Sequence, residues 1–60
     1  EAITRFNEAI EYDKHNALAF LERGKVLLAT GKNSRAISDL KKASSLGQGE
    51  ASVLLKEIDN

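Results

Sequence analysis

The chain has no cysteine, only one histidine and no long run of apolar residues. Without cysteine it can form no disulfide and has no thiolate for catalysis or metal binding, although this absence does not identify its compartment. His15 has a single carboxylate, Asp13, close to it in sequence, whereas a zinc site uses three or four ligands. No apolar run approaches the roughly 20 residues that cross a bilayer. We therefore expect no metal, no cofactor and no membrane partner.

An excess of charge of one sign is also missing. Nine Lys and Arg residues balance nine Asp and Glu residues, so the formal net charge is zero. Proteins that bind nucleic acid usually present a basic face that displaces counterions from the phosphates. The charge balance therefore predicts that nucleic acid is not the partner.

A catalytic centre is not recognisable either. Gly47 and Gly49 lack the preceding strand and the following lysine of a phosphate-binding loop. The acidic residues are spread along positions predicted to face solvent, and the serines have no second histidine-like base within reach. The serines in question are Ser34, Ser38, Ser44, Ser45 and Ser52. The sequence therefore predicts that the chain is not an enzyme.

What the chain does contain is an internal repeat. When it is shifted by 34 residues, residues 1–26 lie over residues 35–60, and the apolar positions coincide while the polar ones vary. Two helices with the same burial pattern at a fixed period are typical of helical repeat arrays, in which each unit covers its neighbour's apolar face. This pattern indicates an interaction scaffold. The identical apolar pairs are Ala2 with Ala36, Ile3 with Ile37, Ala9 with Ala43, Ala17 with Ala51, and Leu21 with Leu55.

Apolar residues spaced by three and four predict an all-α chain, and no alternating run predicts a strand. Asn16 is suited to cap the start of the second helix, and Gly31 is suited to end it with a positive φ. We expect Gly47 and Gly49 to break the third helix. The short connections make neighbouring helices antiparallel. The four predicted helices cover residues 2–13, 17–30, about 33–46 and about 50–59.

Small residues stand where these helices must approach one another closely. Gly24 lies inside a predicted helix, where glycine costs about 1 kcal/mol relative to alanine, so we attribute it to close helix contact. The Lys41–Lys42 pair, near Arg35 and Asp39, predicts instead a mixed, solvated face. The predicted core of the antiparallel stack consists of Phe6, Phe20, Gly24, Leu27, Ala36, Leu40 and Ala43.

With this spacing the chain resembles the tetratricopeptide repeat, whose consensus runs W-x2-L-G-x2-Y and then A-x3-F. Phe20 stands at the Trp position, Gly24 at the Gly and Leu27 at the Tyr, while Ala36 and Leu40 fill A-x3-F. The resemblance implies a fragment of an α-solenoid with about one and two-thirds repeats. Its phase assigns residues 1–16 to the second helix of one repeat, 17–50 to one complete repeat, and 51–60 to the first helix of a following repeat or to a C-terminal capping helix.

The chain departs from the family pattern in three places. Arg23 occupies the usual Leu site, which predicts an edge nearer to solvent. Lys14 and Gln48 stand where the family has proline between repeats. Ile58 takes the place of the small residue that Gly24 supplies, and its bulk would push a following helix away.

In this family the first helices of successive repeats line a concave groove that receives an extended peptide or a partner's helix. The alternative is that the leucines placed there are ordinary packing and that Lys25 is a solvated charge. Leu18 and Leu21 exceed what the main apolar stripe needs, which favours the groove. By resemblance, the groove residues are Leu18, Leu21, Lys25, Leu28, Ser52 and Lys56.

Some relatives carry a carboxylate clamp that holds the acidic C-termini of heat-shock chaperones through cations and amide donors. Here Glu22 stands where the clamp needs Asn, and Ser52 stands where it needs Lys. Only Lys56 fits, in place of an Arg. The sequence therefore argues against this clamp.

The leading interpretation is a protein-interaction scaffold whose partner is a protein or peptide. One alternative is a pentatricopeptide-like RNA-binding repeat, which needs a basic groove. Another is a purely structural spacer within a larger protein. The open apolar faces of the first and last helices also favour self-association of the isolated fragment.

Overall fold

The computed structural model describes residues 2–59, apart from the side chains of Ala2 and Asp59. Glu1 and Asn60, the outer residues of the first and last predicted segments, lie outside the described residues. Within this range the chain is all-α and has no strand, which confirms the predicted class. The helices are α1 (Ala2–Tyr12), α2 (Ala17–Ala29), α3 (Asn33–Ser45) and α4 (Gly49–Asp59).

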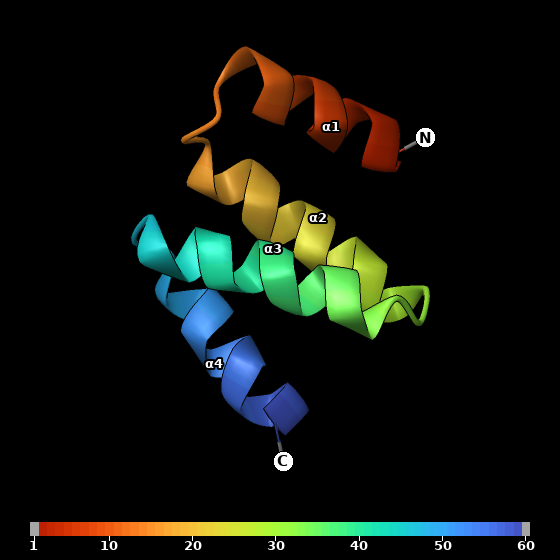
Figure 1. Cartoon of the computed structure of the whole chain (residues 1–60), viewed down its shortest axis with the longest axis vertical. Helices are drawn as coiled ribbons and strands as arrows, with labels where there is room; N and C mark the ends of the chain where they lie inside the picture. Colours follow the sequence, from red (N-terminus) through yellow and green to blue (C-terminus); the bar gives the residue numbers. More distant parts are fainter. Residues whose placement is uncertain (1, 60) are drawn as a thin grey trace.

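The four helices follow one another down the long axis of the molecule, and each turns back on the one before it (Figure 1). Helix α1 packs on α2, α2 on α3 and α3 on α4, and the α2–α3 pair makes the most extensive contact. The result is a flat stack of 33 × 24 × 14 Å. No helix between residues 2 and 59 is both long and apolar enough to span a membrane.

Helix α2 begins and ends as the sequence predicts. The side-chain oxygen of Asn16 accepts a hydrogen bond from the backbone N–H of Ala19 at 3.1 Å, which satisfies one of the unpaired donors of the first turn. After the last turn Gly31 takes a φ of +81°, and the N–H of Lys32 then donates to the carbonyl of Leu27 at 2.8 Å. A left-handed glycine followed by this bond is the Schellman motif that closes many helices.

Helix α3 ends in the same way, at a second left-handed glycine. Gly47 has a φ of +104°, and the N–H of Gln48 donates to the carbonyl of Ala43 at 3.0 Å. Gly49 was also expected to break the third helix; α3 ends before it, and Gly49 is the first residue of α4, one position before the predicted start at about residue 50. The left-handed Gly47 alone turns the chain, so no second break is needed.

The main core lies at the seam where α2, α3 and α4 meet. Its buried centre is formed by Leu21, Leu40, Ala43 and Ala51, and half-buried apolar side chains from α2 and α4 pack around it. Of the predicted core, Gly24, Leu27, Ala36, Leu40 and Ala43 are buried, whereas Phe6 and Phe20 are only half-buried. Phe6 lies on α1, which packs on one neighbour and contributes nothing to the central cluster.

Close contact between α2 and α3 explains the glycine inside α2. A Cβ atom added to Gly24 would lie 2.9 Å from Cδ2 of Leu40 and 3.5 Å from the backbone oxygen of Ala36. The first distance is shorter than van der Waals contact, so a larger residue would displace the buried Leu40. The attribution of Gly24 to close helix contact is therefore confirmed.

Candidate functional site

The predicted groove residues lie on α2 and α4, but they differ widely in exposure. Leu18 is 57% exposed at the start of α2. Leu28, near the other end of α2, is half-buried against the core. Ser52 and Lys56 are exposed on α4. Leu18 and Leu28 are ten residues apart, so this surface runs about 15 Å along α2.

Leu21 does not belong to this surface. The structure places it in the centre of the core with 2% of its surface exposed, beside Leu40, Ala43 and Ala51. A side chain enclosed by three helices cannot reach a partner without unfolding the seam. This corrects the position predicted for Leu21, and a binding role for the remaining five residues stays a prediction.

Lys25 connects the two helices that carry the surface. Its Nζ lies 2.6 Å from a carboxylate oxygen of Glu50 on α4 and 3.6 Å from one of Glu22 on α2. The hydrogen bond to Glu50, together with the charge of Glu22, raises the pKa of Lys25 above its ordinary value. The cation is therefore matched by carboxylates of its own chain, which leaves it poorly placed to capture an acidic ligand.

A second contact between neighbouring helices lies at Ser52. Its hydroxyl is hydrogen-bonded to the hydroxyl of Ser44 on α3, and either oxygen can be the donor. In the shifted alignment these two positions correspond to Leu18 and Ile10, which are apolar. These two positions therefore change from apolar in the first copy of the pattern to polar in the second.

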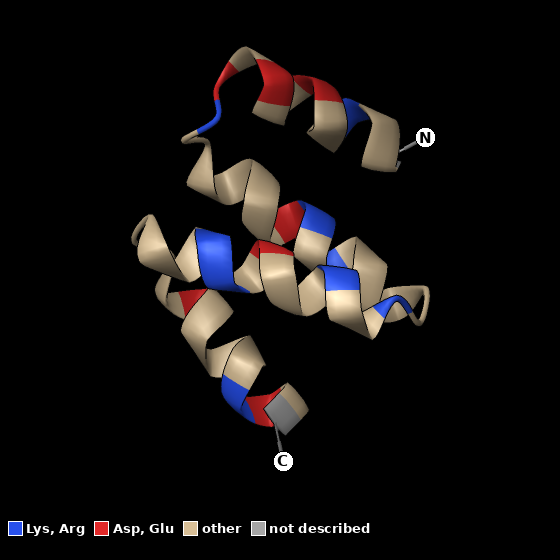
Figure 2. Cartoon of the chain, viewed as in Figure 1, with Lys and Arg blue, Asp and Glu red and all other residues tan. Residues whose placement is uncertain are grey.

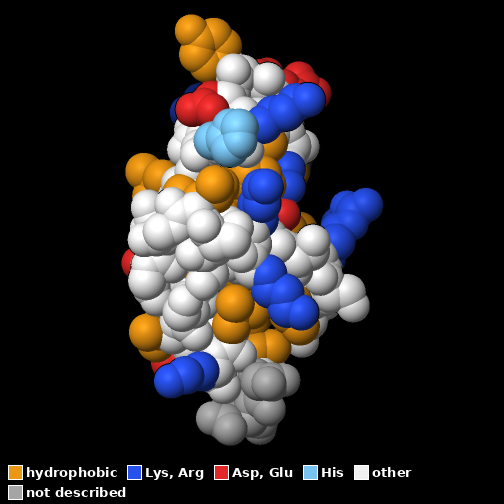
Figure 3. All heavy atoms as spheres, turned by 60° about the vertical axis from the view of Figure 1, so that its left-hand side comes forward, with side chains coloured by type: hydrophobic (Ala, Val, Ile, Leu, Met, Phe, Trp, Pro, Cys, Tyr) orange, Lys and Arg blue, Asp and Glu red, His pale blue; other side chains and the backbone are white. Residues whose placement is uncertain are grey.

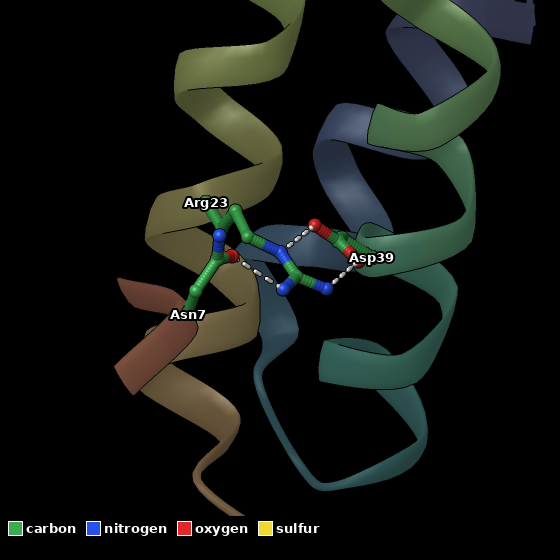
Figure 4. Close-up of polar contacts among 3 residues, drawn as sticks. All are labelled: Asn7, Arg23 and Asp39. Atoms are coloured by element: carbon green, nitrogen blue, oxygen red, sulfur yellow. Dashed lines mark hydrogen bonds and ion pairs between the residues drawn. The ribbon is translucent and has the colours of Figure 1, made fainter. Parts of the chain in front are cut away.

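A polar contact among three helices was missed by sequence reasoning. The guanidinium of Arg23 on α2 donates two hydrogen bonds to Asp39 on α3, from Nε at 2.6 Å and from Nη2 at 2.7 Å. Its remaining nitrogen, Nη1, donates to the side-chain oxygen of Asn7 on α1 at 2.9 Å. Figure 4 shows this one side chain joining three helices. Such a bidentate pair fixes both the distance between the two side chains and their relative orientation.

This arrangement corrects two expectations. Asp39 was assigned to a solvated face, yet only 6% of its surface is exposed. Arg23 was expected at an edge nearer to solvent, whereas most of its side chain is covered and its guanidinium lies 5.5 Å from the centre of the Phe20 ring. The signal was present in the sequence, because Asp39 falls on the same stripe of α3 as Ala36, Leu40 and Ala43.

The ion pair lines a hollow of about 480 Å³ between α1, α2 and α3. The hydrogen bonds and the charge of Asp39 raise the pKa of Arg23 above its ordinary value, so the guanidinium stays charged. Because Asp39 already neutralises this charge, the hollow offers no free cation at Arg23 for an anionic ligand. We assign the three-residue contact to holding α1, α2 and α3 in place.

His15 lies exposed in the connection between α1 and α2. Its backbone N–H donates to the carboxylate of Asp13 at 2.9 Å, which is an ordinary turn contact. Among the described residues no three His, Cys, Asp or Glu side chains come together as a metal site. Both signs of charge occur on each of the four helices (Figure 2).

Comparison with known proteins identifies a related segment in a longer protein. The chain is 44% identical over 48 residues to DnaJ homolog subfamily C member 3 of Gallus gallus. The match covers 80% of this chain but only 10% of that protein. No family model matches the chain, and no solved structure matches it. What is shared is thus a short segment of about the size of this helical stack.

Proposed function

We propose that the chain is a piece of a tetratricopeptide-like array and acts as a protein-interaction scaffold. Four antiparallel helices with a close α2–α3 contact at Gly24 and a second copy of the apolar pattern fit such an array. The similarity to a segment of DnaJ homolog subfamily C member 3 fits it as well. Both findings support the fold that we propose. The binding surface is a separate part of the proposal.

The observation that carries the function is the exposed strip on α2 and α4. Leu18 presents an apolar side chain to solvent on α2, and Lys56 presents a charge on α4. The strip is held in place by the buried core that α2 and α4 share with α3, and the exposed ion pair between Lys25 and Glu50 adds a contact between its two helices. A surface that is held rigid in this way binds a partner without first having to be ordered, which favours affinity.

The chemistry of the strip favours a peptide or helix of mixed character. Leu18 and Leu28 offer apolar contact, while Ser52 and Lys56 offer polar contact. Lys25 is already paired with Glu22 and Glu50, so a purely acidic ligand would meet two carboxylates close to its target. We therefore expect a partner segment with at least one apolar anchor rather than an acidic tail.

A selection from a library of displayed peptides against the immobilised chain tests this function. We expect enriched peptides that bind the native chain and lose at least about tenfold in affinity with Leu18→Glu or Lys56→Glu. Lys42→Glu is the matched control for Lys56→Glu, because it makes the same change of charge at an exposed position of α3, which contributes no predicted groove residue.

Two results would count against the scaffold. If no peptide is enriched, or if all three variants behave alike, the strip is not a binding surface and the role of spacer is favoured. Retention of labelled RNA on a filter at micromolar protein and low salt would favour the pentatricopeptide-like alternative.

A further inference from the structure

The outer face of α4 exposes apolar side chains whose counterparts on α2 are buried. Val53 is 56% exposed, whereas Ala19, which lies 34 residues earlier, is 6% exposed. Leu55 is half-buried, whereas its counterpart Leu21 is 2% exposed. The face shown in Figure 3 includes a group of hydrophobic side chains next to the C-terminal end. Beside α4 lies a hollow of about 310 Å³ lined by Ile37, Lys41, Leu55 and Ile58.

Helix α1 shows the reciprocal feature at the other end of the stack. Its sequence counterpart is α3, whose Leu40 and Ala43 are fully buried between α2 and α4. The corresponding Phe6 and Ala9 of α1 are only half-buried, because α2 covers α1 from one side. Among the described residues, α1 and α4 are thus each packed on one neighbouring helix, whereas α2 and α3 are each packed on two.

The charges at these two ends are complementary. The pair that joins α2 to α3 is Arg23 with Asp39. In the 34-residue shift, Arg23 corresponds to Glu57 on α4, and Asp39 corresponds to Arg5 on α1. The same pair of positions thus carries the same two charges with their places exchanged. Both Glu57 and Arg5 are exposed.

The third member of the contact follows the same rule. Asn7, which accepts a hydrogen bond from Arg23, corresponds to Lys41 on α3. Asn7 is an acceptor that lies beside the cation Arg23, whereas its counterpart Lys41 is a cation and the counterpart of Arg23 is the acid Glu57. The three positions therefore carry residues suited to the same polar contact, with the positive and negative charges exchanged.

We propose that a second copy of the chain docks its α1 against α4 of the first, as α3 docks against α2 within one chain. Arg5 of the second copy then pairs with Glu57 of the first, above the hollow beside α4. The contact is head-to-tail, so it leaves one open end on each copy and can be extended. It uses the two ends of the stack, and it therefore stands independently of the groove proposed above.

The fit is looser than that between α2 and α3. Ile58 stands where α2 has Gly24, and even a Cβ atom at Gly24 would lie 2.9 Å from Leu40. The docked helix must therefore stay farther from α4 than α3 stays from α2. We expect weak association, with a dissociation constant on the order of 0.1 mM.

Sedimentation equilibrium from about 10 μM to 1 mM tests the proposal with charge-reversed variants of the 60-residue chain. Arg5→Glu and Glu57→Arg each set like charges against each other and should weaken association about tenfold. The double variant restores opposite charges in the new order and should return association to within about twofold of the native chain. Circular dichroism checks that each variant keeps its helices.

Glu8→Arg is the matched control for net charge, since its counterpart in the shift, Lys42, is exposed on α3. It should leave association unchanged within about twofold. A native chain that stays monomeric up to 1 mM would overturn the proposal. A double variant that associates no more strongly than the two single variants would also overturn it. Neither result would bear on peptide binding by the groove, which is measured on immobilised chain at low concentration.

Discussion

Helices α3 and α1 carry the same apolar pattern, and the structure treats them differently. Leu40 and Ala43 on α3 have no exposed surface, while Phe6 and Ala9 at the same positions of α1 are half-exposed. The pattern is equal, but α3 has helices on both sides and α1 has one. The comparison shows that in a helical stack the neighbours, rather than the helix's own sequence, determine how deeply a position is buried.

The charged residues at one equivalent position of α3 and α1 show the same effect of neighbouring helices. Asp39 is buried and held by the guanidinium of Arg23, whereas Arg5 is exposed. A buried carboxylate has to be paired, because an unpaired one would lose its hydration without compensation. The opposite charge of Arg5 is tolerated where water reaches it.

The largest expected difference between α3 and α1 comes from removing a large side chain. Leu40→Ala should lower the free energy of unfolding by about 3–4 kcal/mol, because it opens a cavity at the central seam. Phe6→Ala removes more atoms but should cost only about 1–2 kcal/mol, since the ring is half-exposed. Urea unfolding followed by circular dichroism compares them. If Phe6→Ala costs more than Leu40→Ala, the core does not lie at the α2–α3–α4 seam.

The next difference concerns the charged position. Asp39→Ala should cost about 2 kcal/mol, because it leaves a mostly covered guanidinium without its partner. This is less than for a fully enclosed pair, since part of Arg23 still reaches water. Arg5→Ala should change stability by less than about 0.5 kcal/mol. Equal effects in thermal melts at low protein concentration would show that the ion pair does not hold the helices.

Replacing a small side chain by a larger one also tests the difference in burial between α3 and α1. Ala43→Leu should overpack a fully enclosed site and cost about 1–3 kcal/mol. Ala9→Leu extends into a half-open position and should cost less than about 1 kcal/mol. The two melting temperatures, measured side by side, decide this. No loss for Ala43→Leu would overturn the assignment of that position to the core.

The ends of the two helices differ as well. Gly47→Ala forces a Cβ into the left-handed conformation that closes α3 and should cost about 1 kcal/mol. Its counterpart after α1 is Asp13, and Asp13→Ala removes only an exposed turn contact, so it should cost less than about 0.5 kcal/mol. A neutral Gly47→Ala in denaturant melts would mean that the turn does not need a positive φ.

The smallest expected effect is a dependence on pH. Pairing with Glu50 raises the pKa of Lys25 above 10.5, so its contribution is complete at neutral pH and is lost as the pH rises above that value. The stability difference between the native chain and Lys25→Met should therefore shrink above pH 10.5. It should also shrink in high salt, because the pair is exposed. A difference that is constant with pH would exclude the pair as its cause.

Much of this fold followed from local rules that act within a few residues. Apolar spacing defined the four helices, and Asn16 and Gly31 marked the limits of α2 as the structure shows them. The close contact at Gly24 followed from the cost of glycine inside a helix. The helices and their ends depend on the helix itself, and the contact at Gly24 is indicated by a residue that is unfavourable within its own helix, so the sequence contains enough information to place all of them.

What escaped prediction depends on which helices meet. Leu21 looked like a surplus apolar residue suited to a groove, but α3 and α4 together enclose it. Asp39 looked like one of several solvated charges, because nothing local indicates that Arg23 of another helix faces it. Both errors arise at positions with two neighbouring helices, where burial cannot be judged from one helix alone.

The central claim is that equal patterns are unequally buried, and native-state hydrogen exchange tests it most directly. At low protein concentration, backbone amides in the middle of α3, including those of Leu40 and Ala43, should exchange only through global unfolding. Those of Phe6 and Ala9 in α1 should exchange at least about tenfold faster, because α1 can open from one neighbour. Equal protection of α1 and α3, or greater protection of α1, would contradict the account.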